Sequence, residues 1–181
     1  MALTNEKMLE IFKDNIEVFQ EKISRNVNFG TVLITIQQAK DGSFGLGYCP
    51  APNDMLQNSR TKDMLAFVFK SVVESSGAKG VMLFQQANVI MYDRDDLEAH
   101  KQMKSVRQEK LRVEQIPGNK EVLVCHFETT TIQRMIIIEV IGKPPFTFKE
   151  ISSGKEGDEM IVTGRFSNLL YKKPINKFSG N

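Results

Sequence analysis

The chain has 181 residues, of which 41% are hydrophobic and 25% charged, and its formal net charge is +2. This length predicts one domain with a core of its own, and the composition is that of an ordinary globular protein. A net charge so close to zero excludes a bulk polycation and an acidic solvating chain.

The first fifty residues predict a helix followed by a β-hairpin. Residues 4–25 repeat apolar side chains at spacings of three or four, which predicts a helix with one apolar face, and Thr4 suits its N-cap. The β-branched run 31–37 and the segment 44–48 flank turn residues and predict two paired strands. The prolines in residues 49–54 predict a loop, because proline cannot donate to a central ladder.

A second helix is predicted from Thr61 to Gly77, where glycine can adopt the left-handed conformation that ends a helix. Apolar residues cover most of its circumference, so we expect this helix to be largely buried. These apolar positions are Met64, Leu65, Phe67, Val68, Phe69, Val72 and Val73.

The middle of the chain predicts strands on both sides of a charged segment. Residues 80–92 are apolar and β-branched around a polar centre, which predicts one bulged strand or two short ones. Residues 93–112 are charged and have moderate helix propensity. Residues 121–128 and 131–141 are the clearest strands, and the threonines between them suggest a hairpin turn.

The last part of the chain predicts a final hairpin and a tail. Residues 146–151 and 160–166 flank a flexible loop and could pair with each other. Residues 167–181 show little periodicity and form a basic C-terminal tail, which leaves residues 1–166 as a single α+β domain.

These elements together predict an α+β fold with a mainly antiparallel sheet of about six to eight strands. Strands that follow one another in adjacent pairs favour antiparallel pairing. We expect the N-terminal helix and the buried second helix to cover this sheet on one face.

The cysteine content and the apolar runs predict a protein of the cytoplasm. Cys49 and Cys125 are too few for a disulfide framework, and no Cys/His spacing suits zinc. The first residues lack the basic and apolar blocks of a signal peptide, and no apolar run reaches the ~20 residues that span a bilayer. We expect no membrane association and no cofactor.

Nucleophilic chemistry finds little support in the sequence. Cys125 and His126 are adjacent in a predicted strand, so their side chains point to opposite faces and cannot form a dyad. We expect a core cysteine beside a surface histidine. Cys49 lies in the predicted loop, and no nearby residue in the sequence would lower the pKa of its thiol.

A short acidic cluster offers weak candidates for a metal site. Asp93, Asp95 and Asp96 could hold Mg²⁺ if other groups joined them. The same carboxylates suit the N-terminus of a helix, where free backbone N–H groups accept negative partners, and we favour that interpretation.

Two basic segments are the candidate binding residues. Basic side chains contact phosphates and aromatic rings stack on bases, so the pattern is compatible with nucleic acid or with a protein partner. A solvated helix face and an unattached basic tail are the simpler explanation. The candidate residues are Lys101, Lys104, Arg107, Lys110, Arg112, Tyr171, Lys172, Lys173 and Lys177.

About a third of the chain resembles a group of uncharacterised small proteins encoded by bacteriophages. The residues that carry this resemblance are the strand 80–84, the charged segment after it and the strand 119–124. The chain departs from that group at Gln85-Gln86-Ala87, where an acidic and aromatic ending is usual. The resemblance implies an origin in a phage or mobile element and brings no catalytic residues with it.

The leading hypothesis is a non-enzymatic cytosolic binding or accessory protein, phage-encoded, that engages a host or phage protein. Its candidate surfaces are a sheet edge, the 100–112 segment and the C-terminal tail. The sequence leaves open whether the chain forms a homo-oligomer. One alternative is a nucleic-acid-binding protein that uses the two basic segments. A second alternative is a metal-dependent hydrolase or nuclease that uses residues 93–96.

Overall fold

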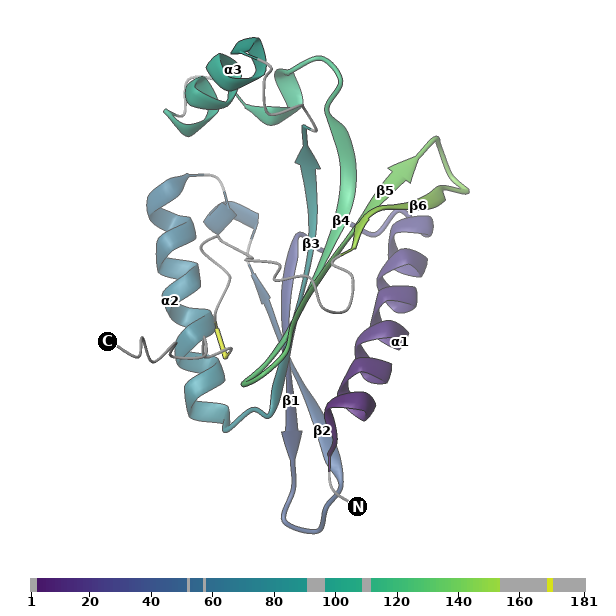
Figure 1. Ribbon diagram of the computed structural model, residues 1–181, viewed down its shortest axis with the longest axis vertical. Helices are drawn as coiled ribbons and strands as arrows, with labels where there is room; N and C mark the ends of the chain where they lie inside the picture. Colours follow the sequence, from purple (N-terminus) through teal and green to yellow (C-terminus); the bar gives the residue numbers. More distant parts are fainter. Residues whose placement is uncertain are drawn as a thin grey trace, which may run out of the picture.

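The computed structural model describes residues 3–51, 53–56, 58–90, 97–108, 112–153 and 169–170. In this part of the chain a six-stranded antiparallel sheet lies between two helices, one on each face (Figure 1). The elements are α1 (Asn5–Ser24), β1 (Thr31–Gln38), β2 (Phe44–Ala51), the 3-10 helix η1 (Asn53–Leu56), α2 (Ser59–Ser76), β3 (Gly80–Val89), α3 (Leu97–Arg107), the 3-10 helix η2 (Val113–Gln115), β4 (Lys120–Thr129), β5 (Gln133–Ile141) and β6 (Thr147–Ser153).

The α+β fold and the antiparallel sheet are confirmed, with strand order β2-β1-β3-β4-β5-β6 among the described residues. The two predicted hairpins are present as β1–β2 and β4–β5, and residues 80–89 form the single long strand β3. Strand β6 matches residues 146–151, whereas the other half of the predicted last hairpin, residues 160–166, lies outside the described residues.

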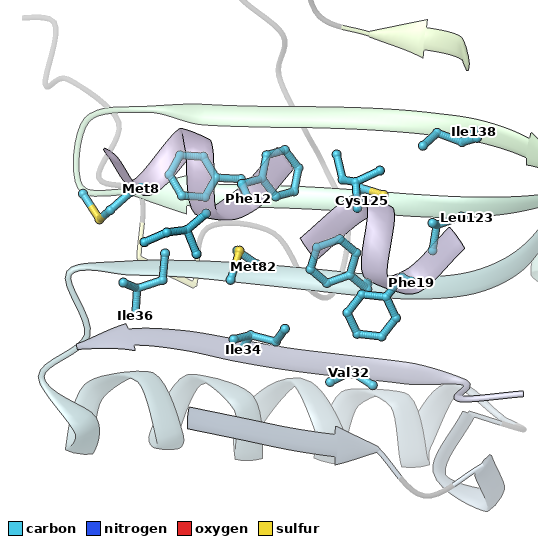
Figure 2. Packing of buried hydrophobic residues seen from close by; sticks show 14 of the residues in the cluster. Met8, Phe12, Phe19, Val32, Ile34, Ile36, Met82, Leu123, Cys125 and Ile138 are labelled. Atoms are coloured by element: carbon cyan, nitrogen blue, oxygen red, sulfur yellow. The ribbon is translucent and has the colours of Figure 1, made fainter. Parts of the chain in front are cut away.

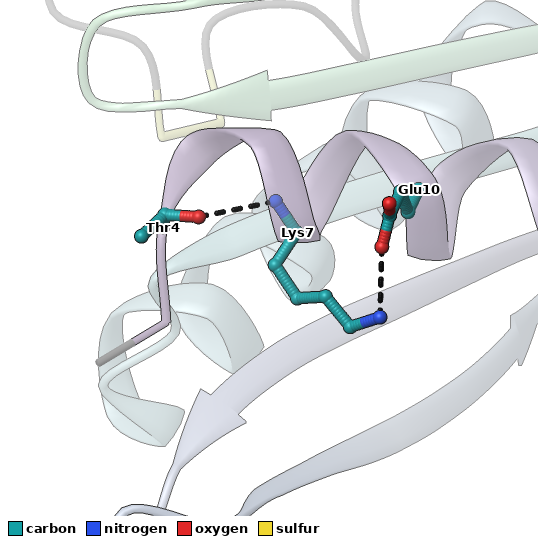
Figure 3. A network of polar contacts seen from close by, with 3 residues as sticks. All are labelled: Thr4, Lys7 and Glu10. Atoms are coloured by element: carbon teal, nitrogen blue, oxygen red, sulfur yellow. Dashed lines mark hydrogen bonds and ion pairs between the residues drawn. The ribbon is translucent and has the colours of Figure 1, made fainter. Parts of the chain in front are cut away.

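Helix α1 forms where its capping and its apolar periodicity predict it. The Thr4 hydroxyl accepts a hydrogen bond from the Lys7 backbone N–H at 3.2 Å, and the Lys7 ammonium pairs with Glu10 at 2.8 Å (Figure 3). Its buried face, with Met8, Phe12 and Phe19, packs on the sheet (Figure 2). The rings of Phe12 and Phe127 stack with centroids 5.3 Å apart. The core on this face of the sheet is mainly apolar, and the buried amide of Asn15 donates a hydrogen bond to the Ile11 carbonyl of the same helix at 2.8 Å.

Helix α2 packs on the opposite face of the sheet, so the expectation that both helices share one face is wrong. Its buried residues Leu65, Phe69 and Val73 join a second core with Leu33 and Leu83 of the sheet. Strand β1 shows the physical reason. It buries six consecutive residues, so both of its faces must be covered.

The termini of α2 follow the sequence, although the helix begins two residues before the expected Thr61. The Asn58 side chain accepts a hydrogen bond from the Thr61 backbone N–H at 3.0 Å, and Gly77 ends the helix with a φ of 61°. The described helices include none that is long and apolar enough to cross a membrane.

The outward face of α2 is exposed, so the prediction of a largely buried helix is wrong on this side. Met64 is 55%, Phe67 73% and Val68 42% exposed, whereas Phe69 is fully buried. A helix that rests on a sheet buries only one side, and no described element covers the other side of α2.

We expect Phe69→Ala to lower the free energy of unfolding by about 3–5 kcal/mol, because it opens a cavity in the core. The matched change Phe67→Ala on the same helix should cost no more than about 0.5 kcal/mol, because its ring is already exposed. Urea unfolding followed by circular dichroism measures both. Equal losses for the two variants would contradict this orientation of α2.

Candidate functional site

The face of the sheet beneath α2 carries buried polar side chains from β4. Strand alternation places His126 and Glu128 on this face, where they lie opposite Leu83 and Val81 of β3. The expectation of a surface histidine is wrong, because His126 is only 5% exposed. Cys125 points to the opposite face and is fully buried in the α1 core, as expected.

In the described part of the chain, His126, Gln133 and Leu170 lie around the Glu128 carboxylate, which is fully buried. Its Oε1 lies 3.3 Å from His126 Nε2 and accepts a hydrogen bond from Gln133 Nε2 at 3.0 Å. Its Oε2 accepts a hydrogen bond from the Leu170 backbone N–H at 2.8 Å. Both oxygens therefore have partners, as a buried carboxylate requires.

The Glu128 cluster joins the sheet to a distant part of the chain. Leu170 is 42 residues from Glu128 in sequence, and its neighbour Leu169 is buried in the α2-side core. The boundary of the domain at residue 166 stays a prediction, but these two residues of the predicted tail contact the sheet. The only sequence signal for the cluster is the alternation of His126 and Glu128 on one strand face.

Neither cysteine has the environment of an activated nucleophile. Cys49 is partly buried on β2, which continues to Ala51 rather than ending before the prolines. This is possible because β2 is an edge strand, where a missing N–H leaves no ladder bond unmade. Burial raises the pKa of the Cys49 thiol, and burial together with the Glu150 charge raises the pKa of Cys125.

The outward face of α2 exposes three large apolar side chains close together on one helix. Its apolar residues border a shallow hollow of about 640 Å³, and the charged residues Arg60 and Asp63 line the same hollow. The exposed apolar side chains are those of Met64, Phe67 and Val68. Contiguous apolar surface with a charged rim is typical of interaction sites.

The structure places part of the basic 100–112 segment on α3, which lies beyond the ends of β3 and β4 (Figure 1). Lys101 and Lys104 are exposed on α3, and Lys101 lies 3.6 Å from the exposed Glu98. Arg112 is exposed just before η2. Arg107 ends α3, but its side chain is outside the described part.

The other sequence candidates also lie outside the described residues. Among the described residues there is no group of three or more His, Cys, Asp or Glu side chains that could hold a metal ion. The candidates that lie outside are Lys110, Tyr171, Lys172, Lys173 and Lys177 of the basic segments and Asp93, Asp95 and Asp96 of the acidic cluster. Their roles stay predictions.

Comparison with known proteins finds no matching family model, no matching curated protein and no matching solved structure. The functional conclusion therefore depends on the surfaces described above.

We expect Glu128→Ala to lower the free energy of unfolding by about 3 kcal/mol, because it leaves the buried donors around it without an acceptor. Glu128→Gln retains an oxygen acceptor and should cost less. The matched control Glu121→Ala changes an exposed residue near the start of the same strand and should cost no more than about 0.5 kcal/mol. Urea unfolding measures all three. A Glu128→Ala loss as small as that of the control would contradict a structural role for the cluster.

Proposed function

We propose that this chain is a non-enzymatic accessory protein that binds a protein partner through the outward face of α2. The observation that carries the proposal is the exposure of Met64, Phe67 and Val68 side by side on one helix. Single exposed apolar residues are common on protein surfaces, but three neighbours that border one hollow are not explained by the packing of this fold.

The chemistry of this face suits protein recognition. An aromatic ring and a methionine in a shallow hollow offer large apolar contact area, and aromatic residues often dominate binding energy. Arg60 and Asp63 at the rim would add charge contacts that select the partner and its orientation.

The buried acid and base on the sheet support a binding role over a catalytic one. His126 and Glu128 are side by side, but Gln133 and the Leu170 backbone occupy the carboxylate oxygens. A general base must reach a proton of its substrate, and this carboxylate instead holds two parts of the chain together.

We extend the proposal to a phage-encoded factor that acts in the cytoplasm on a host or phage protein. The support is the resemblance of residues 80–84 and 119–124 to bacteriophage proteins. In the structure these residues belong mostly to β3 and β4, two neighbouring strands at the centre of the sheet. The resemblance therefore concerns the sheet of this domain and not the outward face of α2.

A photo-crosslinking amino acid at position 67 should form covalent adducts with a protein in native cells, because the ring of Phe67 points away from the core. The matched control is Val18 on α1, which is also exposed, at 46%, and does not line this hollow. Adducts are measured by mass spectrometry after denaturing purification. Absence of adducts from position 67, or equal adducts from position 18, would contradict the proposed function.

Nucleic-acid binding is the second candidate function, and the exposed Lys101 and Lys104 on α3 favour it. These two side chains are three residues apart, so one phosphate backbone could contact both.

Lys101→Gln with Lys104→Gln should weaken DNA or RNA binding and reduce the slope of log affinity against log salt by about 1.8 for duplex DNA, since each phosphate contact contributes roughly 0.9. Fluorescence anisotropy over a salt series measures this slope. The control is Lys13→Gln with Lys40→Gln, two exposed lysines elsewhere on the fold. If the wild-type chain shows no binding at low salt, the candidate is excluded.

A further inference from the structure

The outward face of α2 carries opposite charges at its two ends and an aromatic ring midway between them. Arg60, Phe67 and Glu74 are spaced by seven residues, so nearly two full helical turns separate each from the next and all three lie along one line. All three are exposed to solvent. The face is therefore complementary in charge to an inverted copy of itself.

We propose that a second copy of this chain covers this face, with the two α2 helices antiparallel about a two-fold axis at Phe67. The proposal rests on the proposed function and names the partner of the same surface. In this arrangement each Arg60 meets Glu74 of the partner subunit, and the two Phe67 rings meet at the axis. The contact is isologous, so the single sequence supplies both ion pairs.

The remaining exposed positions of this face agree with the same axis. Residues on the same flank of α2 face one another across this axis, which places Asp63 beside the oppositely charged Lys70 of the partner subunit and Met64 beside Ser71 of the partner subunit. No two like charges face each other. A parallel arrangement in register would instead place Arg60 against Arg60 and Glu74 against Glu74, which costs free energy at both ends.

The geometry of a helix also sets the scale of the contact. Each ion pair lies seven residues, or about 10 Å, from the axis, within the reach of two helices that cross at a shallow angle. A contact made by one helix from each subunit is smaller than the roughly 800 Å² per partner of a standard interface. We therefore expect a concentration-dependent dimer with a dissociation constant in the micromolar range.

The test is a charge exchange measured by sedimentation equilibrium at low salt. Arg60→Glu alone places glutamate against glutamate at both ends of the interface, and Glu74→Arg alone places arginine against arginine. Each single variant should therefore dimerise at least tenfold more weakly than wild type. The variant with both substitutions should recover wild-type association. An equimolar mixture of the two single variants should also dimerise, because every contact between the two different chains again pairs Arg with Glu.

Recovery in the mixture is specific to the antiparallel axis, since a general loss of folding or a contact elsewhere would not restore it. Phe67→Glu should give a monomer, whereas Val18→Glu on α1 should leave association unchanged. Circular dichroism spectra matching wild type confirm that each variant is folded, since all of these side chains are exposed.

A wild-type chain that stays monomeric up to several hundred micromolar overturns the proposal, and so does a dimer that survives Phe67→Glu. These failures are distinguishable from failure of the proposed function. Crosslinks from position 67 to a different protein, with a monomeric wild-type chain, would support the function and overturn the second copy as its partner.

Discussion

The burial of strand β1 on both of its faces is the constraint on which the rest of the structure depends. Residues 31–36 are all buried, and β1 pairs with β2 on one side and β3 on the other. Because successive side chains point to opposite faces, a strand with six consecutive buried residues is covered on both faces. One helix is therefore needed on each face, and α1 and α2 supply the two layers.

The two cores that result have different chemistry. The α1 side is mainly apolar, with the stacked rings of Phe19 and Phe84 at centroids 4.3 Å apart, and its buried Asn15 is satisfied by its own helix. The α2 side includes the buried His126 and Glu128. Leu169 and Leu170 also pack into this core. A buried carboxylate is stable only with donors around it, so the second core depends on segments that are far apart in sequence.

The outward face of α2 follows from the same layered arrangement. A helix that covers a sheet on one side has its other side free for contact, and in α2 that side carries Phe67 rather than a polar residue. The proposed dimer would add a further layer of helix to each protomer. It would also bury the apolar surface that otherwise costs free energy in water.

The sequence by itself determined the local elements, because capping, glycine stops and hydrophobic periodicity act within a few residues. Thr4 begins α1, Gly77 ends α2, and the hairpins β1–β2 and β4–β5 lie where alternation and turn residues predict them. The exposed lysines of α3 were also found this way, since a charged helix exposes its charges.

Only the tertiary structure decided which faces of these elements meet. Phe67 and Phe69 are the same residue type two positions apart, and the sheet alone determines that one is exposed and the other buried. Strand alternation predicts on which face of the sheet His126 lies, but it does not predict what covers that face. The expectation of a surface histidine is wrong for this reason. The cover includes Leu170, whose contact with Glu128 spans 42 residues, and no local pattern encodes a contact over such a distance.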